Sequence, residues 1–333
     1  MGETILEVRD LHTHFSTYRG LLRAVDGVGL TVERGETLAL VGESGCGKSV
    51  TALSIMRLVR RPGRIVRGAA LFDGEDLLRK SNAAMRRIRG GRIGMVFQDP
   101  LSTLNPTFSV ETQIVESLKV HGAARGREAR ERSVELLEAM GIPAPQERLR
   151  AYPHELSGGM RQRVMIAIAV SCEPELLIAD EPTTALDVTL QAQIMDLLAE
   201  IKEQRGLAIV LITHDLGIVS QFSDRAAVMY AGQIVEYGPV AELLEEPLHP
   251  YTQGLLRCVP RLGRPDVPIT PIEGSVPDMT ALPPGCRFAP RCPRVEDRCG
   301  GEMPSVYRAG PGRAVRCHLY EGVGEPECSR ESG

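Results

Sequence analysis

The sequence predicts an α/β fold, in which the strands of a mostly parallel sheet alternate with amphipathic helices. Short, continuously apolar runs recur along the chain, and such runs indicate strands that are buried on both faces of a sheet. These runs span residues 37–41, 93–97, 176–179 and 208–213. Segments with helical periodicity lie between them, and this alternation is typical of α/β proteins.

Three of the intervening segments are predicted as helices. Residues 189–204 place apolar side chains at helical spacing, with Leu190, Ile194, Leu197, Leu198 and Ile201 on one face. Residues 128–140 form a second amphipathic segment, which Gly141 and Pro143 close. A third helical run covers 164–170. The composition changes after Pro247, where Pro, Gly, Arg and Cys dominate and no long periodic helix follows Leu256.

The overall composition is that of a globular protein with ample length for a core. Hydrophobic residues make up 43% of the 333 positions and charged residues 25%. The net charge of −4 does not suggest a nucleic-acid partner. No apolar stretch approaches the roughly 20 residues that cross a bilayer, and residues 1–9 lack the apolar core of a signal peptide. We therefore expect a cytoplasmic chain.

A glycine-rich loop follows the first predicted strand. Gly42–Ser49 reads GESGCGKS, which fits G-x-x-x-x-G-K-[ST] between a strand and a helix. The glycines let backbone N–H groups point at a phosphate, and the helix start adds its positive dipole end. Lys48 can reach the β- and γ-phosphates, and the Ser49 hydroxyl suits Mg²⁺. The predicted phosphate-binding residues are Gly42, Ser44, Gly45, Cys46, Gly47, Lys48, Ser49 and Val50.

Two carboxylates end the strand predicted at 176–179. Asp180 and Glu181 follow Leu176-Leu-Ile-Ala directly, and a buried parallel strand delivers its C-terminal residues to the ligand edge of the sheet. Asp180 is predicted to hold Mg²⁺ through water. Glu181 is predicted to orient and deprotonate the water that attacks the phosphate.

A second anion-binding helix start is predicted at residues 156–162. Ser157 occupies the position of an N-cap, and Gly158 and Gly159 expose backbone N–H groups in the first turn. This segment has no lysine of its own. A simple capped helix is the alternative interpretation.

Together these residues resemble the nucleotide-binding subunit of an ABC transporter. Gly42–Ser49 matches the Walker A motif and 176–181 resembles Walker B, while 156–162 matches the family signature. The remaining motif residues are Gln98 of the Q-loop, Ala185-Leu186-Asp187 of the D-loop and the switch histidine His214. The resemblance implies a P-loop NTPase of the ABC type, with a RecA-like core and antiparallel β and helical subdomains.

The resemblance also assigns roles to single residues. It implies Glu181, His214 and Gln98 as catalytic residues, and Ser49, Gln98 and Asp180 as the Mg²⁺ site. In this family, ATP lies between two such chains, so Ser157, Gly158, Gly159 and Asp187 would serve the ATP of a partner. Tyr18 is the candidate for stacking on the adenine, with Phe15 as the second choice.

Three further segments resemble the ATPases of oligopeptide and dipeptide importers. They are His249-Pro-Tyr-Thr, the run from Gln98 to Pro106, and Pro283-Pro-Gly-Cys-Arg-Phe-Ala-Pro-Arg-Cys-Pro. This likeness implies an ATPase domain over 1–250, with a helical subdomain at about 100–170, and a C-terminal extension over 251–333. The expected partners are two transmembrane permeases, a second similar ATPase subunit (most simply a heterodimer) and an extracytoplasmic substrate-binding protein. The chain would then lie peripherally on the cytoplasmic face of the cell membrane.

Other functions are left open by the sequence. The cargo could be nickel or another small solute, because other subunits select it. A soluble ABC ATPase without a pore, such as a translation or DNA-repair factor, is a second alternative. A regulatory module without turnover is a third, although Glu181 and His214 speak against it.

A cysteine cluster near the C-terminus predicts a metal centre. Cys286, Cys292, Cys299 and Cys317 are spaced C-x₅-C-x₆-C-x₁₇-C, without the close pairs of zinc fingers. Disulfides are disfavoured in the cytoplasm. Four thiolates at loose spacing can hold a [4Fe–4S] cluster, with a Cys₄ zinc site as the alternative. Cys328 is predicted to be free. The cluster is expected to be structural, fastening the extension to the core or to a permease.

Overall fold

The computed structural model describes residues 2–184, 186–258 and 270–322, together with 325 and 326. Ala185 and Cys328 thus lie outside the described residues. The chain divides into two compact units. The first unit comprises Met1–Leu6, Val32–Thr37 and Phe72–Ile212, and the second comprises Glu7–Thr31, Leu38–Leu71 and Thr213–Gly333.

A parallel three-stranded layer forms the centre of the first unit. Its strands β6 (Ile93–Val96), β7 (Leu176–Asp180) and β8 (Ala208–Thr213) lie in the order β8-β7-β6. Every residue of the three strands is buried, as expected for continuously apolar sequences covered on both faces. The strands predicted at 93–97, 176–179 and 208–213 are therefore confirmed, because their ends agree within one residue.

Helices make up most of the rest of the first unit. The three helices predicted from periodicity are present as α5 (Gly126–Ala139), α7 (Gly158–Val170) and α8 (Val188–Arg205). The other elements are β5 (Glu75–Asp76), α2 (Asn82–Ile88), α3 (Pro100–Thr103), α4 (Val110–Val120) and α6 (Pro145–Arg148). The α4, α5 and α7 helices pack against one another. Gly206 ends α8 in a left-handed conformation with φ 61°, which a glycine adopts without steric cost.

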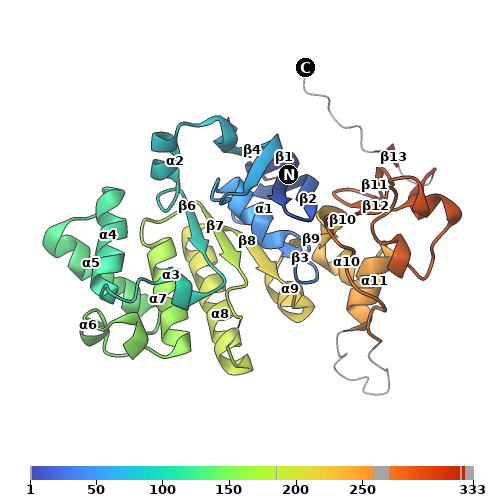
Figure 1. Ribbon diagram of the computed structural model, residues 1–333. Helices are drawn as coiled ribbons and strands as arrows, with labels where there is room; N and C mark the ends of the chain where they lie inside the picture. The colour runs from blue at the N-terminus through green and yellow to red at the C-terminus, as the bar shows by residue number, and fades with distance from the viewer. Residues whose placement is uncertain (1, 185, 259–269, 323–324, 327–333) are drawn as a thin grey trace. The chain divides into compact units, whose positions relative to one another are not determined.

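The second unit contains the glycine-rich loop and a mixed sheet (Figure 1). Strand β3 (Thr37–Val41) is buried throughout and pairs in parallel with β9 (Arg225–Tyr230), so the strand predicted at 37–41 is confirmed. Strand β10 (Gln233–Pro239) continues the sheet antiparallel to β9, and β12 (Ala314–Arg316) pairs antiparallel with β10. The edge is completed by β11 (Val306–Arg308) and β13 (Glu325–Pro326).

The remaining elements of this unit surround the loop. A hairpin joins β1 (Thr4–Thr17) to β2 (Gly20–Glu33), and β4 (Gly63–Phe72) lies beside β1. The helices are α1 (Lys48–Ile55), α9 (Leu216–Phe222), α10 (Val240–Glu245) and α11 (Pro250–Arg257). Sequence periodicity did not predict strands β1 and β2, because partly buried residues interrupt the alternation of apolar and polar side chains along them.

An aromatic cluster fastens residues 270–322, which we call the C-terminal segment, to the sheet. Phe288 of this segment lies 5.2 Å from the ring of Tyr230 in β9 and 5.4 Å from that of Tyr251 in α11. All three side chains are almost fully buried. Because such rings bury much apolar area, they supply a core for a segment that is otherwise rich in Pro, Gly and Arg.

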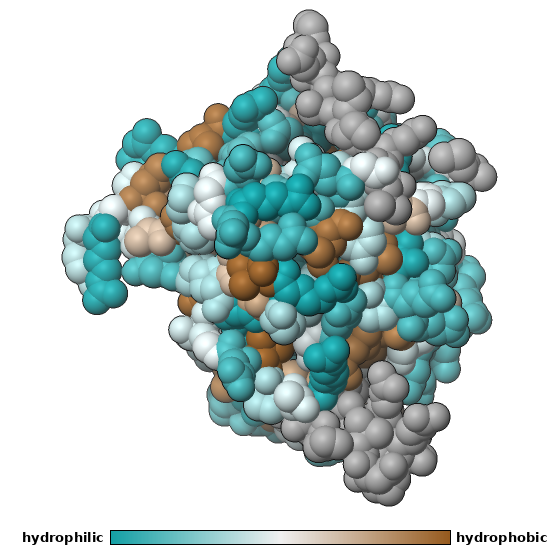
Figure 2. Space-filling view, turned by 90° about the vertical axis from the view of Figure 1, so that its right-hand side faces the viewer, coloured by the Kyte–Doolittle hydropathy of each residue, from teal (hydrophilic) through white to brown (hydrophobic). Residues whose placement is uncertain are grey.

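Figure 2 shows a face on which hydrophilic side chains dominate and hydrophobic ones form small, separate groups. Among the helices of the described residues, none combines the length and apolar character that crossing a bilayer requires.

Candidate functional site

The loop between β3 and α1 has the shape that its glycines predict. Gly42, Gly45 and Gly47 have positive φ angles of 155°, 78° and 111°. A Cβ on Gly42 would lie 2.2 Å from the carbonyl oxygen of Met229, and one on Gly47 would lie 2.2 Å from that of Ala24. Only glycine fits at these two positions, because the loop approaches neighbouring backbone so closely.

Lys48 is the first residue of α1, and its side chain folds back over the loop. The Nζ atom donates to the carbonyl oxygens of Gly42 at 2.7 Å and Glu43 at 3.1 Å. Cys46 is buried in the same loop, and burial raises the pKa of its thiol. Cys46 is therefore a neutral thiol at pH 7, and its backbone N–H donates to the carbonyl oxygen of Glu43 at 3.3 Å.

In the first unit, β7 ends in the predicted carboxylates. Asp180 is its last residue and is 5% exposed. Glu181 has a left-handed φ of 46°, which is strained for a residue with a side chain, and its N–H donates to Ile212 at 2.9 Å. Strain of this kind persists where the surroundings fix the backbone, and it is concentrated at functional sites.

Two side chains hold the Glu181 carboxylate. Its Oε2 accepts a hydrogen bond from Gln98 Nε2 at 2.9 Å and another from the Thr184 hydroxyl at 2.9 Å. Because β6 and β7 are parallel neighbours, the residues that follow them meet at one edge of the sheet. The structure thus brings together two residues that the sequence predicted separately. Thr184 was not predicted, although its place three residues after Glu181 was a possible signal.

The helix start predicted at 156–162 is confirmed. Ser157 is the N-cap of α7, and its side chain accepts a hydrogen bond from the N–H of Met160 at 3.3 Å. Ser157 and Gly158 are exposed, whereas Gly159 is buried beneath Leu190. Asp187 caps α8 in the same way, accepting from the N–H of Leu190 at 2.9 Å. At the start of α7, Ser157 and Gly158 are therefore accessible, while the N–H of Met160 is already bonded to the cap.

The remaining predicted ATP-site residues lie at exposed positions of the second unit. Tyr18 lies at the tip of the β1–β2 hairpin with 92% of its surface exposed, and Arg19 lies over its ring at 5.4 Å. Phe15 packs beside Gly63, where an added Cβ would lie 2.5 Å from its ring. Of the two aromatic candidates, Tyr18 is thus the one with a free face. His214 directly follows β8 and is also exposed.

The four clustered cysteines are brought together in the C-terminal segment. The backbone N–H of Cys286 donates to the carbonyl of Cys299 at 2.8 Å. Burial, together with the charges of Cys286, Cys292 and Cys299, raises the pKa of Cys317 to about 11. Burial and the charges of Cys299 and Cys292 likewise raise the pKa of Cys286. The backbone hydrogen bond places Cys286 beside Cys299.

Comparisons with known proteins agree with this geometry. The ABC transporter family matches residues 25–184, and the C-terminal region of oligopeptide/dipeptide transporters matches 235–299. The oligopeptide transport ATP-binding protein AppD of Bacillus subtilis is 50% identical over 96% of this chain and 98% of its own. The chain belongs to the ABC transporter family. The dipeptide transport ATP-binding protein DppD of Escherichia coli is 46% identical over 97% of this chain and 99% of its own.

A solved structure shows the same fold for this ABC transporter chain. The dimeric post-hydrolysis state of the ATP-binding cassette MJ0796, bound to ADP and phosphate, matches with a TM-score of 0.64 and 27% identity. The match covers 71% of this chain and 98% of that one. The P-loop NTPase fold of the ABC type is thereby confirmed, and as a member of this family the chain is an ATP hydrolase.

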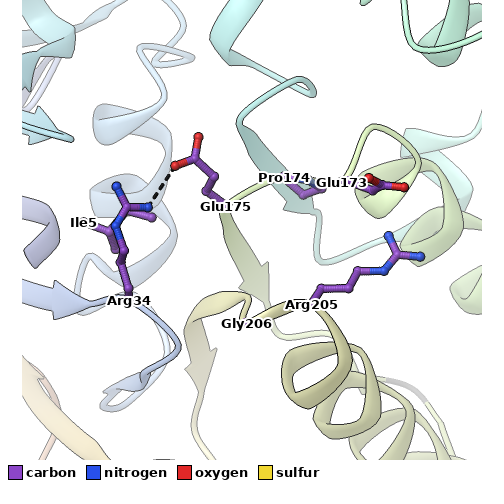
Figure 3. Close-up of a pocket in the computed structure, with 7 residues that line it drawn as sticks. All are labelled: Ile5, Arg34, Glu173, Pro174, Glu175, Arg205 and Gly206. Atoms are coloured by element: carbon purple, nitrogen blue, oxygen red, sulfur yellow. Dashed lines mark hydrogen bonds and ion pairs between the residues drawn. The ribbon is translucent and has the colours of Figure 1, made fainter. Parts of the chain in front are cut away.

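A cleft of the ABC chain lies away from these motifs. It has a volume of about 560 Å³ in the first unit and adjoins the residues that precede β7 and β8 (Figure 3). Its charged side chains pair with one another, since Arg34 donates to Glu175 at 2.9 Å. The pKa of Glu175 is lowered by a hydrogen bond from Arg92 and by Arg34. Because the cleft is at the opposite strand ends from Asp180, we interpret these pairs as structural.

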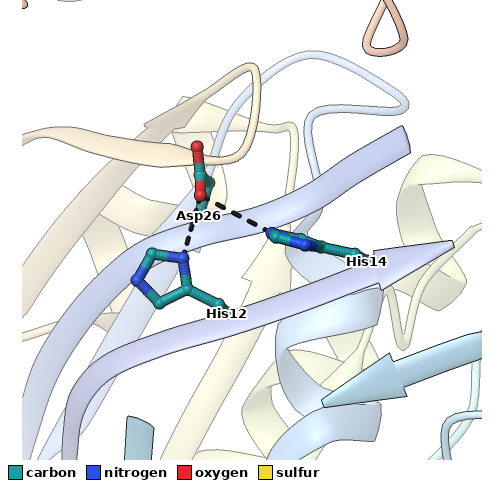
Figure 4. A group of neighbouring side chains, drawn as sticks. All are labelled: His12, His14 and Asp26. Carbon is teal, nitrogen blue, oxygen red and sulfur yellow. Dashed lines mark hydrogen bonds and ion pairs between the residues drawn. The ribbon is translucent and has the colours of Figure 1, made fainter. Parts of the chain in front are cut away.

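A second polar cluster joins β1 and β2 (Figure 4). His12 Nδ1 lies 2.9 Å and His14 Nε2 lies 3.7 Å from Asp26 Oδ1, a spacing at which a metal ion would fit. The signal in the sequence was His-x-His, which puts both rings on one face of a strand. However, the buried Arg287 already pairs with Asp26, and Arg67 pairs with the Asp10 beside His12. We therefore interpret the cluster as an ion-pair network.

Proposed function

We propose that this chain is the ATP-binding subunit of an ABC importer that hydrolyses ATP to power the uptake of dipeptides and oligopeptides. The observation that carries the proposal is similarity over nearly the full length to two peptide transport ATP-binding proteins, at 50% and 46% identity. The match of 235–299 to the C-terminal region of such transporters supports the same cargo. Import of nickel or another small solute remains the alternative, as does a soluble ABC ATPase without a pore.

Residues of the sequence motifs are proposed to bind the nucleotide. Gly42–Ser49 and Val50 bind the phosphates, and Tyr18 stacks on the adenine. Mg²⁺ bound with the nucleotide would neutralise charge on the β- and γ-phosphates. The residues that would hold it are Ser49, Gln98 and Asp180, an all-oxygen set of the kind that Mg²⁺ prefers. The buried carboxylate of Asp180 supports this assignment.

In the proposed reaction, Glu181 is the general base. Its carboxylate takes a proton from water, the water oxygen bonds to the γ-phosphorus, and the bond from that phosphorus to the bridging oxygen breaks, leaving ADP. Gln98 and Thr184 each donate a hydrogen bond to Glu181 Oε2, and these two bonds orient the carboxylate. His214 is proposed to contact the γ-phosphate as the switch histidine.

A complete site would require a second ATPase chain. The exposed start of α7 offers N–H groups but no lysine, so Ser157, Gly158 and Gly159 are proposed to bind the ATP of a partner, with Asp187 at the same interface. The partner is a similar ATPase subunit, most simply in a heterodimer. Two permeases and an extracytoplasmic binding protein complete the complex, which places this chain peripherally on the cytoplasmic face of the membrane.

The proposed domain organisation is an ATPase domain over 1–250, with a helical subdomain at about 100–170, and a Cys-rich extension over 251–333. We further propose that Cys286, Cys292, Cys299 and Cys317 hold a [4Fe–4S] cluster with a structural role. In a tetrahedral zinc site, the sulfur atoms would lie about 3.8 Å apart. Among the described residues, no three of these sulfur atoms lie within 4.8 Å of one another. The sequence spacing, which lacks the close cysteine pairs of zinc fingers, supports the iron–sulfur cluster over zinc.

Reconstitution of the transporter tests the proposed function. The chain would be purified with its permeases and partner ATPase and inserted into liposomes that contain ATP. Addition of the binding protein loaded with a dipeptide or oligopeptide should produce ATP-dependent peptide uptake, and the Lys48→Ala chain should abolish it. Uptake of nickel without uptake of peptide would show that the transporter carries nickel and not peptides. ATPase activity without any dependence on permeases would favour the soluble alternative.

A further inference from the structure

One residue of the phosphate loop, Glu43, is held by side chains from the C-terminal part of the chain. Its backbone N–H donates to the Tyr251 hydroxyl at 2.9 Å. Its two carboxylate oxygens accept from Arg291, with Nη1 to Oε2 at 2.7 Å and Nη2 to Oε1 at 3.0 Å. Two parallel bonds of this kind between charged groups are both strong and directional.

The third polar group of Glu43 acts within the loop. Its carbonyl oxygen accepts from Lys48 Nζ at 3.1 Å and from the N–H of Cys46 at 3.3 Å. A rotation of the Glu43 backbone would therefore break the bonds that hold both the Lys48 side chain and the Cys46 N–H in the loop. The position of Glu43 consequently sets the shape of the loop.

The two side chains that hold Glu43 are themselves rigid. Tyr251 is fully buried, and its ring lies 4.6 Å from that of Tyr230. The Arg291 side chain is 4% exposed, and its Nε donates to the carbonyl of Glu273 at 3.0 Å. Neither group can follow Glu43 if the loop moves, so both act as fixed supports.

Charge gives Arg291 a second effect on the loop. An unpaired carboxylate on Glu43 would repel the negative phosphates of a nucleotide. Fastening the C-terminal segment does not require this particular acceptor, because Arg291 also donates to the Tyr230 hydroxyl of β9 at 3.4 Å. The ion pair with Glu43 thus neutralises an acid within the loop.

We propose that Tyr251 of α11 and Arg291 of the C-terminal segment are positioning residues for the phosphate loop, through which these two parts of the chain set its affinity for ATP. The inference rests on the proposed assignment of Gly42–Ser49 to the nucleotide phosphates. Any event that displaces the segment carrying Arg291, which directly precedes Cys292, lowers nucleotide affinity. The cysteine region thereby becomes a regulatory element of the ATPase rather than a fastening alone.

The test measures binding of a non-hydrolysable ATP analogue with Mg²⁺ to the full chain by calorimetry. Arg291→Ala should weaken binding roughly 10- to 100-fold, and Tyr251→Phe about tenfold, the range for losing hydrogen bonds to charged or buried groups. In the assembled transporter, KM for ATP should rise while kcat at saturating ATP stays within about twofold. Arg257→Ala, which removes an exposed arginine at the end of α11, is the control and should bind normally.

Rescue separates a positioning role from a purely structural one. Adding Glu43→Gln to Arg291→Ala removes the unpaired carboxylate and should restore part of the lost affinity, whereas it cannot repair a misfolded segment. Normal binding by both Arg291→Ala and Tyr251→Phe overturns the inference, and so does a loss that Glu43→Gln leaves unchanged. Lys48→Ala is measured in parallel. If that variant binds the analogue as tightly as the wild type, the proposed nucleotide site fails instead.

Discussion

Replacement of Glu181 by glutamine should separate proton transfer from every other role of this side chain. Glu181 Oε2 accepts one hydrogen bond from Gln98 and one from Thr184, each at 2.9 Å. A glutamine can place its carbonyl oxygen where Oε2 lies and its NH₂ group where Oε1 lies. Both hydrogen bonds then persist, and the strained backbone at φ 46° is unaffected. The one property lost is the ability to accept a proton.

The size of the effect follows from that single loss. A positioned general base contributes about 10²- to 10⁴-fold to a rate, which corresponds to about 2.7–5.4 kcal/mol of transition-state stabilisation. Affinity for ATP should stay within a few-fold of the wild type, because the phosphate loop is untouched. The variant should therefore bind ATP normally and hydrolyse it very slowly.

Phosphate release from the assembled transporter measures turnover, and calorimetry with ATP measures binding. Glu203→Gln, at an exposed position near the end of α8, is the matched control and should hydrolyse ATP at the normal rate. Turnover by Glu181→Gln within about threefold of the wild type would refute the assignment of the base. A large loss of ATP affinity would instead mean that Glu181 has a binding role.

Three further results are expected. Lys48→Ala and Ser157→Arg chains should each be inactive. If the chain pairs with itself, half of the dimers in an equal mixture contain one chain of each kind and so one intact site, and the mixture should recover about a quarter of the activity. Full activity of Ser157→Arg alone would contradict the shared site. Anaerobically purified protein should be brown and contain about four iron atoms per chain. Colourless protein with about one zinc per chain would instead indicate a Cys₄ zinc site. Burial alone would raise the pKa of Asp26, but Arg287 and His12 hold it below its usual value. Asp26→Asn should cost about 3 kcal/mol at pH 7, because Arg287 is left buried without its partner. Urea unfolding measures this difference in the free energy of unfolding between wild type and variant. The difference should shrink as the pH falls from about 3.9, the ordinary pKa of an aspartate, through the lowered pKa of Asp26 in the folded chain. An undiminished difference at pH 2 would contradict the ion pair.

The sequence predicted those parts of the fold whose signals are local. Strands β3, β6, β7 and β8 are continuously apolar because they are buried on both faces, and each lies within one residue of its predicted range. The cap of α7 was equally predictable, because Ser157 bonds to a residue only three positions away. Contacts of this kind join residues that are close in the sequence, so a short segment is enough to predict them.

The contacts around Glu43 could not be predicted in this way. Tyr251 and Arg291 lie 208 and 248 positions from Glu43, and nothing in their neighbouring residues indicates that distant partner. The same holds for Arg287, which meets Asp26 across 261 positions. Ion pairs between remote segments depend on the complete fold, and a pattern of spacing carries no information about them.

The pairing of β12 with β10 bears on the solubility of truncated chains. The three-residue strand β12 of the C-terminal segment pairs with β10, where Glu236 faces Val315 and Tyr237 faces Ala314. Removal of the segment would leave a row of unpaired backbone groups beside the buried carboxylate of Glu236. Such bare edges template association between molecules, whereas short strands flanked by arginines such as Arg308 and Arg316 discourage it. A chain that stops before residue 306 should therefore aggregate, even though each nucleotide-binding motif is still present.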